Sequence, residues 1–279
     1  MLWIPVLIAC TSGPDAGPGS GTFRVLTYNV QGLPDALSAA ERPTLERMER
    51  IAPLLADYEV VGLQEDFDAT NHDALIEGVP HPAVAWFDDP VSPDRVYGAG
   101  LSVLSSLGTP VEVFESHYQQ CHGLLDGASD CLASKGLLIQ RLELAEGIEL
   151  DVYDTHHEAG GGPEDDAARR SQVEEAIASI EGLSAGRAVV FAGDFNLRWS
   201  DPEDLDELQL YADVGLRDAC REVSCPEDDH IDHVLLRSSE QLSLEVIAWS
   251  REEAFVDEDG ADLSDHPAIV AEIAWSIQQ

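Results

Sequence analysis

Short apolar runs separated by polar turn residues recur along the chain and predict a protein built mainly of β-strands. We expect about nine strands, at 23–30, 60–64, 100–105, 136–144, 148–155, 188–192, 231–236, 244–249 and 269–275. The runs 136–144 and 148–155 follow one another closely enough to predict a hairpin.

Two longer segments carry apolar side chains at helical spacing. Residues 41–58 predict a helix that Pro53 should kink or divide, because proline cannot donate the backbone hydrogen bond of a helix interior. Pro163 begins a second helix, whose acidic first turn complements the helix dipole. Many strands with few long helices predict an α/β (α+β) chain in which two sheets pack together with helices outside.

Length and composition allow a large core within a single domain. The chain has 279 residues, of which 44% are hydrophobic, and its composition shows no break after Gly21. We therefore expect one domain over 22–279.

The charge is strongly negative and narrows the choice of partners. The chain has 54 acidic and 15 basic residues, for a net charge of -39, and it contains no basic stretch. Because Lys and Arg supply most non-specific affinity for nucleic acids, this charge disfavours nucleic acid as a partner. We expect a monomer.

The N-terminal segment predicts export. Residues 1–10 form an apolar run that is too short to span a bilayer and ends at Cys10, where the sequence resembles a bacterial lipobox. A signal peptide over 1–10, lipidation of Cys10 and a flexible tether over 11–21 would give a cell-envelope lipoprotein, or a secreted protein. A chance apolar N-terminus or a misplaced start codon is the alternative.

The other four cysteines fall into two local pairs. Cys121 with Cys131 and Cys220 with Cys225 predict two disulfides, which suits an oxidising compartment. A zinc site is the alternative, but the spacing within each pair fits common zinc patterns poorly.

Polar side chains suited to phosphoester chemistry follow several of the predicted strands. Hydrolysis of a phosphoester needs a nucleophilic water, neutralisation of charge on the phosphoryl oxygens and help for the leaving oxygen. Carboxylates and an amide can hold a hard divalent cation, and a histidine can move protons near neutral pH. The residues of these types are Asn29, Glu65, Asp194, Asn196, Asp265 and His266.

Together these strings resemble the endonuclease/exonuclease/phosphatase superfamily, the DNase I-like enzymes that include neutral sphingomyelinases. The matching strings are TYNVQGLP, VVGLQED, YDTHHEAG, VVFAGDFN, IDHVLL and LSDHPAIVAEI. The resemblance implies a four-layer sandwich of two mixed sheets flanked by helices. It also implies a phosphoesterase that depends on Mg²⁺, with Mn²⁺ or Ca²⁺ as alternatives.

The resemblance also implies roles for individual residues. Asn29 and Glu65 would bind the metal, with Asp265 nearby. Asp194 would orient or activate the attacking water, while Asn196 and His156 would contact the phosphoryl group. His266 would act as the general base or as a stabilising cation, and Asp232 would hold its imidazole in the useful tautomer.

Three further residues have less certain assignments. Where the family has Thr-His-Leu, this chain has Thr155-His156-His157, and we favour His156 for the phosphoryl group because it directly follows Thr155. His157 is the weaker candidate and is expected to pack or to lie at the rim. Lys135, the only lysine, and Arg198 are candidate substrate contacts, with a chance survivor and a surface loop as the alternatives.

The favoured function is an exported, sphingomyelinase-like phosphodiesterase that acts on a phosphoester in a membrane lipid. An extracellular nuclease, or a phosphatase of inositol or sugar phosphates, is the second hypothesis. A non-catalytic surface lipoprotein is the third.

Overall fold

The computed structural model describes residues 19–36, 38, 40, 42–92, 95–123, 130–227 and 229–278. Cys10 and most of the tether lie outside these residues, so lipidation and export stay predictions. None of the described helices is long and apolar enough to cross a membrane.

The described chain forms two six-stranded mixed sheets. The first has the order β11-β12-β1-β2-β4-β3, and its only parallel neighbours among the described strands are β1 and β2. Its strands are β1 (Ser20–Asn29), β2 (Val60–Gln64), β3 (Ala83–Phe87), β4 (Leu101–Ser105), β11 (Leu242–Arg251) and β12 (Ile269–Ile277).

The second sheet repeats this plan. Its order is β5-β6-β7-β8-β10-β9, and the described strands that run parallel as neighbours are β7 and β8. Its strands are β5 (Thr109–His117), β6 (Gly136–Ala145), β7 (Ile148–His156), β8 (Ala188–Asp194), β9 (Arg217–Asp218) and β10 (Asp232–Arg237).

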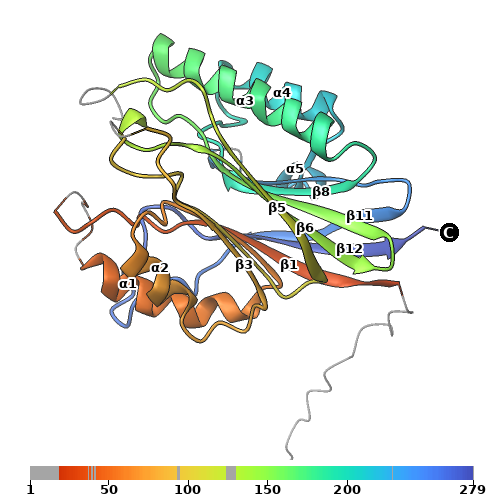
Figure 1. The fold of residues 1–279 in the computed structure, drawn as a ribbon, viewed down its shortest axis with the longest axis horizontal. Helices are drawn as coiled ribbons and strands as arrows, with labels where there is room; N and C mark the ends of the chain where they lie inside the picture. The colour runs from red at the N-terminus through yellow and green to blue at the C-terminus, as the bar shows by residue number, and fades with distance from the viewer. Residues whose placement is uncertain are drawn as a thin grey trace, which may run out of the picture.

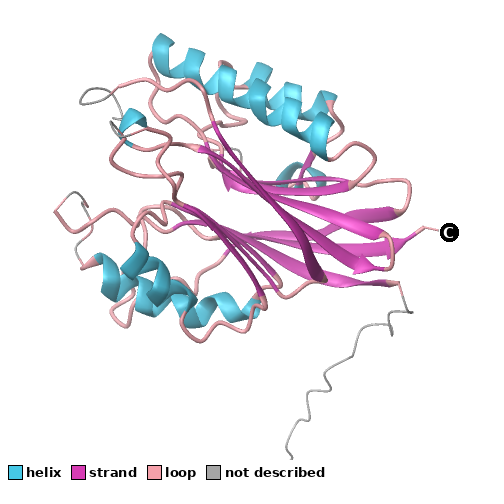
Figure 2. Ribbon diagram, viewed as in Figure 1, coloured by secondary structure: helices cyan, strands magenta, loops and turns pink. Residues whose placement is uncertain are grey.

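The sheets pack face to face, and helices cover both outer faces (Figure 1, Figure 2). Alternation along each strand sends one set of apolar side chains inward and the other outward, as Val25 and Leu26 of β1 show. One outer face carries α1 (Thr44–Ile51) and α2 (Ala69–Ile76), and the other carries α3 (Pro163–Leu183) and α4 (Leu205–Asp213). The four-layer prediction is confirmed.

The predicted elements are present, with additions. All nine predicted strands occur, and β6 pairs with β7 as the expected antiparallel hairpin. The predicted helix over 41–58 divides at Pro53 into α1 and a 3-10 helix over Ala52–Asp57, because α-helical bonding ends there. Elements that the pattern did not predict are β3, β5, β9, α2, α4 and α5 (Ala219–Glu222).

Both predicted cysteine pairs form disulfides. The Cα atoms of Cys121 and Cys131 lie 5.4 Å apart, and those of Cys220 and Cys225 lie 5.1 Å apart.

Candidate active site

The central strands of the two sheets bring the predicted site residues to one rim. In the parallel pair of the first sheet, Asn29 lies beside Gln64, so Glu65 follows directly at the same edge. In the second sheet, His156 lies beside Asp194, which also lies opposite Asp232. Two sheets packed face to face therefore place both strand ends against each other.

Asn29 connects the two sheets at this rim. Its Nδ2 donates to Glu65 Oε1 and to Asp194 Oδ2, each at 3.1 Å, while its Oδ1 accepts from the backbone N–H of Gln31 at 3.0 Å. Asn29 and Asp194 are each only 1% exposed. The amide therefore separates two buried carboxylates that would otherwise repel each other.

The backbone is strained where it presents these side chains. Gln31, Glu65 and Asn196 are left-handed, with φ of 51°, 62° and 49°. This conformation is energetically unfavourable for residues other than glycine, and such backbone strain is common at functional sites. Gly32 allows its loop to reach the carbonyl of Glu65, with which any Cβ at that position would collide.

Two histidines face the Asp194 carboxylate. Its Oδ2 lies 3.4 Å from His156 Nε2 and 3.7 Å from His266 Nε2. The other ring nitrogen of His266 lies 3.0 and 3.1 Å from the two oxygens of Asp232. Asp232 thus fixes the His266 ring so that its second nitrogen points at Asp194, as the resemblance implies.

Burial and charge set opposite protonation preferences in this group. Burial raises the pKa of Asp194, and the charge of Asp232 raises it further. Burial lowers the pKa of His156 well below its usual range, which leaves that imidazole neutral. Burial alone would also lower the pKa of His266, but its hydrogen bond to Asp232 and the surrounding carboxylates raise it to about 10.

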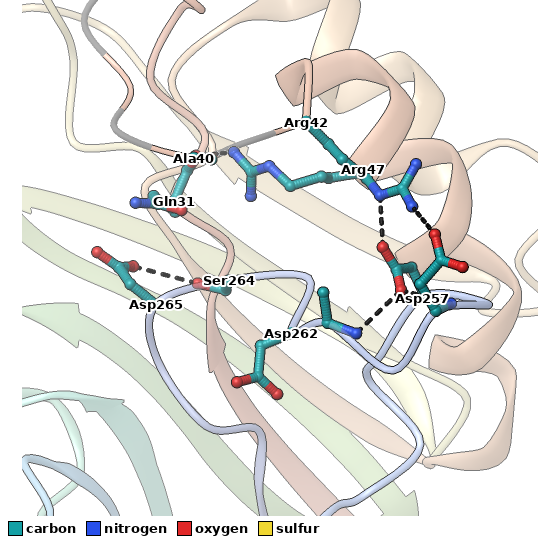
Figure 3. Close-up of a pocket in the computed structure, with 10 residues that line it drawn as sticks. Gln31, Ala40, Arg42, Arg47, Asp257, Asp262, Ser264 and Asp265 are labelled. Atoms are coloured by element: carbon teal, nitrogen blue, oxygen red, sulfur yellow. Dashed lines mark hydrogen bonds and ion pairs between the residues drawn. The ribbon is translucent and has the colours of Figure 1, made fainter.

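Asp265 lies at the exposed mouth of the site and lines a cavity of about 630 Å³ (Figure 3). Asp257, Asp262, Ser264 and Arg42 line the same cavity, and Arg42 pairs with Asp257. Asp262 and Asp265 also border a second hollow that reaches His266. The opening beside His266 therefore carries acidic side chains.

The residues fit a hard divalent cation. Glu65, Asp265 and Asn29 supply oxygen donors, and Asn196, with a backbone N–H that donates to Asp194 at 3.1 Å, completes the polar rim. Burial raises the pKa of Glu65, the hydrogen bond from Asn29 opposes this rise, and the charge of Asp265 adds to it. The amide of Asn29 would have to turn its oxygen, now bonded to Gln31, toward such an ion.

His157 lies packed inside the protein, which is one of the two positions expected for it. Its side chain is fully buried, with Nε2 2.9 Å from the Tyr118 hydroxyl and 3.3 Å from that of Tyr211, so a substrate cannot reach the ring. Adjacent residues of a strand point to opposite faces. The His156 ring therefore faces Asp194, while the His157 ring faces Tyr118 and Tyr211. Burial lowers the pKa of His157 to about 3.

Lys135 and Arg198 lie in contrasting places. The Lys135 ammonium is buried, 2.6 Å from Asp130 Oδ1, and donates to the His157 carbonyl at 2.6 Å. The same carbonyl accepts from Asn196 Nδ2 at 3.1 Å. Lys135 does not line the site but helps to position Asn196 through this shared carbonyl. Arg198 is exposed and reaches Asp229 at 3.5 Å, as expected for a surface loop.

Sequence reasoning missed Arg47, which is almost fully buried. Its guanidinium donates to the carbonyls of Val30, Gln31 and Leu263 at 2.9, 2.7 and 2.8 Å. These bonds join the loop after β1 to the loop that carries Asp265 and His266. Figure 3 shows the Arg47 side chain near Gln31. Its place in the buried stripe of α1, beside Thr44, Met48 and Ile51, was the available signal.

A protein-family model described as the Endonuclease/Exonuclease/phosphatase family matches residues 26–266. The chain belongs to this family. The match contains every residue placed at the rim above, and it confirms the resemblance to this family.

Two sphingomyelinases are similar to this chain. A sphingomyelinase of Mycobacterium tuberculosis is 32% identical over 268 residues, which cover 90% of this chain and 52% of the relative. The chain thus spans about half the length of that protein. Sphingomyelinase C from Streptomyces griseocarneus shares the fold with a TM-score of 0.67 and 21% identity, over 90% of this chain and 99% of that one.

A third similar protein shares the fold. A mutant of beta toxin from Staphylococcus aureus, solved with bound magnesium ions, has a TM-score of 0.66 and 18% identity. The matched region covers 90% of this chain and 99% of the toxin chain. At this identity the likeness shows the fold alone.

Proposed function

We propose that this chain is a Mg²⁺-dependent phosphodiesterase that cleaves the headgroup of a phospholipid of the sphingomyelin type. The arrangement of Asp194 between Asn29, His156 and a His266 ring held by Asp232 carries the proposal. It offers an acceptor for the proton of a water and a neighbouring imidazole that can exchange protons.

Each of the active-site residues has a distinct role in the proposed reaction. Asp194 orients the attacking water, while His156 and Asn196 hold the phosphoryl oxygens. His266 exchanges a proton at Nε2, and Asp232 keeps Nδ1 engaged. Glu65, Asn29 and Asp265 would hold Mg²⁺, which neutralises charge on the phosphoryl group.

The acidic mouth supports a headgroup that carries a positive charge. Asp262 and Asp265 line both hollows, one of which reaches His266, so a choline ammonium would meet carboxylates there. A polynucleotide would meet repulsion from the same groups and from the net charge of -39.

A substrate panel tests the proposal. With Mg²⁺, we expect release of phosphocholine from sphingomyelin vesicles, no release with EDTA, and a loss of at least about 100-fold in Asp194→Ala. Phosphatidylglycerol, inositol phosphates, and single- and double-stranded DNA should react far more slowly. Faster cleavage of DNA would favour the nuclease hypothesis, and no turnover on any substrate would favour the non-catalytic one.

We also propose export with lipid attachment at Cys10. Metabolic labelling with a fatty acid should mark the wild type and spare Cys10→Ser. A fully reduced cytosolic product without label would contradict this.

A further inference from the structure

A second cluster of metal-ligating side chains lies at the start of β10, away from the Asn29 and Glu65 donors. One ligand atom from each of Asp218, Cys220 and His230 lies within 4.8 Å of the others, and all three residues are buried. Cys225 adds a fourth donor, because its sulfur is bonded to that of Cys220.

His230 is the residue in this cluster that the surrounding protein does not explain. Only 3% of it is exposed, yet neither ring nitrogen has a hydrogen-bond partner among the described residues. Its ring lies 4.6 Å from that of His233 and 5.1 Å from that of Trp249, in tilted contacts that supply no hydrogen bond to either nitrogen. A buried polar group without a partner costs about 1–3 kcal/mol, so two on one side chain point to a missing ligand.

The neighbouring histidine shows what a satisfied ring looks like here. His233 Nδ1 lies 2.7 Å from Asp218 Oδ2, and its Nε2 lies 2.9 Å from the Leu197 carbonyl oxygen. Each ring nitrogen of His233 thus faces an acceptor oxygen, whereas neither ring nitrogen of His230 has a partner among the described residues. His233 also orients the Asp218 carboxylate, as residues behind a metal ligand commonly do.

We propose that Cys220 and Cys225 in their dithiol form, together with His230 and Asp218, bind one thiophilic divalent cation such as Zn²⁺. Two thiolates, an imidazole and a carboxylate match the four-coordinate preference of zinc. The disulfide and the metal site are alternative states of the same pair, because sulfurs bonded to each other cannot both bind a metal as thiolates. This site is independent of the phosphodiesterase reaction.

Conversion of the disulfide into the dithiol requires a two-electron reductant. A trialkylphosphine breaks the S–S bond and becomes the phosphine oxide, while water supplies the oxygen and the two protons of the new thiols. Binding of the cation then releases those two protons. A bound metal would restrict the motion of His230 and therefore of the start of β10. At that point the Ile231 carbonyl accepts from the backbone N–H of Phe195 at 2.9 Å.

Cobalt binding to the reduced full-length chain tests the site. We expect a thiolate-to-cobalt charge-transfer band in the wild type after phosphine treatment, and none in the oxidised protein. Cys220→Ser/Cys225→Ser should abolish the band, and His230→Ala should weaken cobalt binding at least about tenfold. The matched variant Cys121→Ser/Cys131→Ser lacks the other pair and should keep the band.

The design separates this site from the active site. The Asn29, Glu65 and Asp265 donors include no sulfur, so cobalt bound there gives no thiolate band whether or not the enzyme turns over. Refolding from urea with cobalt and phosphine present repeats the test without reducing the folded state. No band in either preparation, or a band lost with Cys121 and Cys131 but kept without Cys220 and Cys225, would overturn the proposal.

Discussion

Asp232 controls both the orientation and the pKa of the His266 side chain. It holds the His266 imidazole through Nδ1 and raises its pKa, so His266 is protonated at neutral pH before any metal binds. Replacing Asp232 with Asn removes the charge but keeps the shape of the side chain. The ring then loses the negative charge that stabilises its proton.

We expect Asp232→Asn to lower turnover by about 100-fold or more, since general acid–base catalysis is typically worth that much. The pKa of His266 should also fall from about 10 toward its ordinary value of about 6.5. An NMR titration of the metal-free variant measures this shift. The exposed Asp213→Asn is the control; an unchanged His266 titration would contradict the assignment.

Lys135 and Arg198 test the difference between buried and exposed charge. Lys135→Met leaves Asp130 and the His157 carbonyl without their buried partner, which should reduce the free energy of unfolding by about 3–5 kcal/mol. Arg198→Met removes a surface pair and should change it far less. Urea denaturation of both variants measures this, and equal losses would refute the distinction.

At the scale of elements, α1 positions the active-site loops through Arg47. Arg47→Met leaves the carbonyls of Val30, Gln31 and Leu263 without this buried donor, so we expect a loss of about 3 kcal/mol or more in unfolding free energy. Mg²⁺ affinity should fall as well, because the two loops carry Asn29 and Asp265. Calorimetric titration with Mg²⁺ measures the second effect.

Arg50 provides a control on the same helix. Its side chain pairs with Glu46 and Glu258 at the surface, so Arg50→Met should leave Mg²⁺ affinity unchanged. Arg47→Lys keeps a donor and should restore part of the affinity. If Arg47→Met lowers stability but binds Mg²⁺ as the wild type does, Arg47 has no positioning role.

The sequence predicted those elements whose pattern is local. Strands such as β2 and β8 are continuous apolar runs between turns, and Pro53 marks where α1 ends. By contrast, β5 is exposed along most of its length and contains Pro110, so its strand character depends on pairing with β6. Pairing between distant segments leaves no local pattern.

The site divides in the same way. Motifs at strand ends predicted Asn29 and Asp194 at one rim because parallel neighbours share an edge, whereas His266 lies just before the antiparallel strand β12. The sequence could not identify Arg47 as a residue that positions the site. Its partners are backbone carbonyls, which every residue type carries. The sequence favoured His156 over His157, and the sheet supplies the physical reason, since it turns the His156 ring toward Asp194 and the His157 ring toward Tyr118.

At the scale of the whole molecule, the net charge of -39 opposes the compact state. The 54 acidic groups outnumber the 15 basic ones so far that most cannot form an ion pair. Salt screens this repulsion, because the Debye length falls from about 10 Å at ~0.1 M to about 3 Å at ~1 M. Buried pairs such as Lys135 with Asp130 are screened much less, so the folded state keeps its internal attractions.

We therefore expect the thermal midpoint to rise by several degrees between ~0.05 M and ~1 M NaCl, by a mechanism that acts through charge screening. Equal ionic strengths of NaCl and KCl should act alike, measured by circular dichroism with EDTA present so that no divalent ion contributes. Sulfate stabilises proteins by exclusion and serves as the contrast. A midpoint that falls with NaCl would mean that attractive ion pairs, rather than net repulsion, dominate the surface electrostatics.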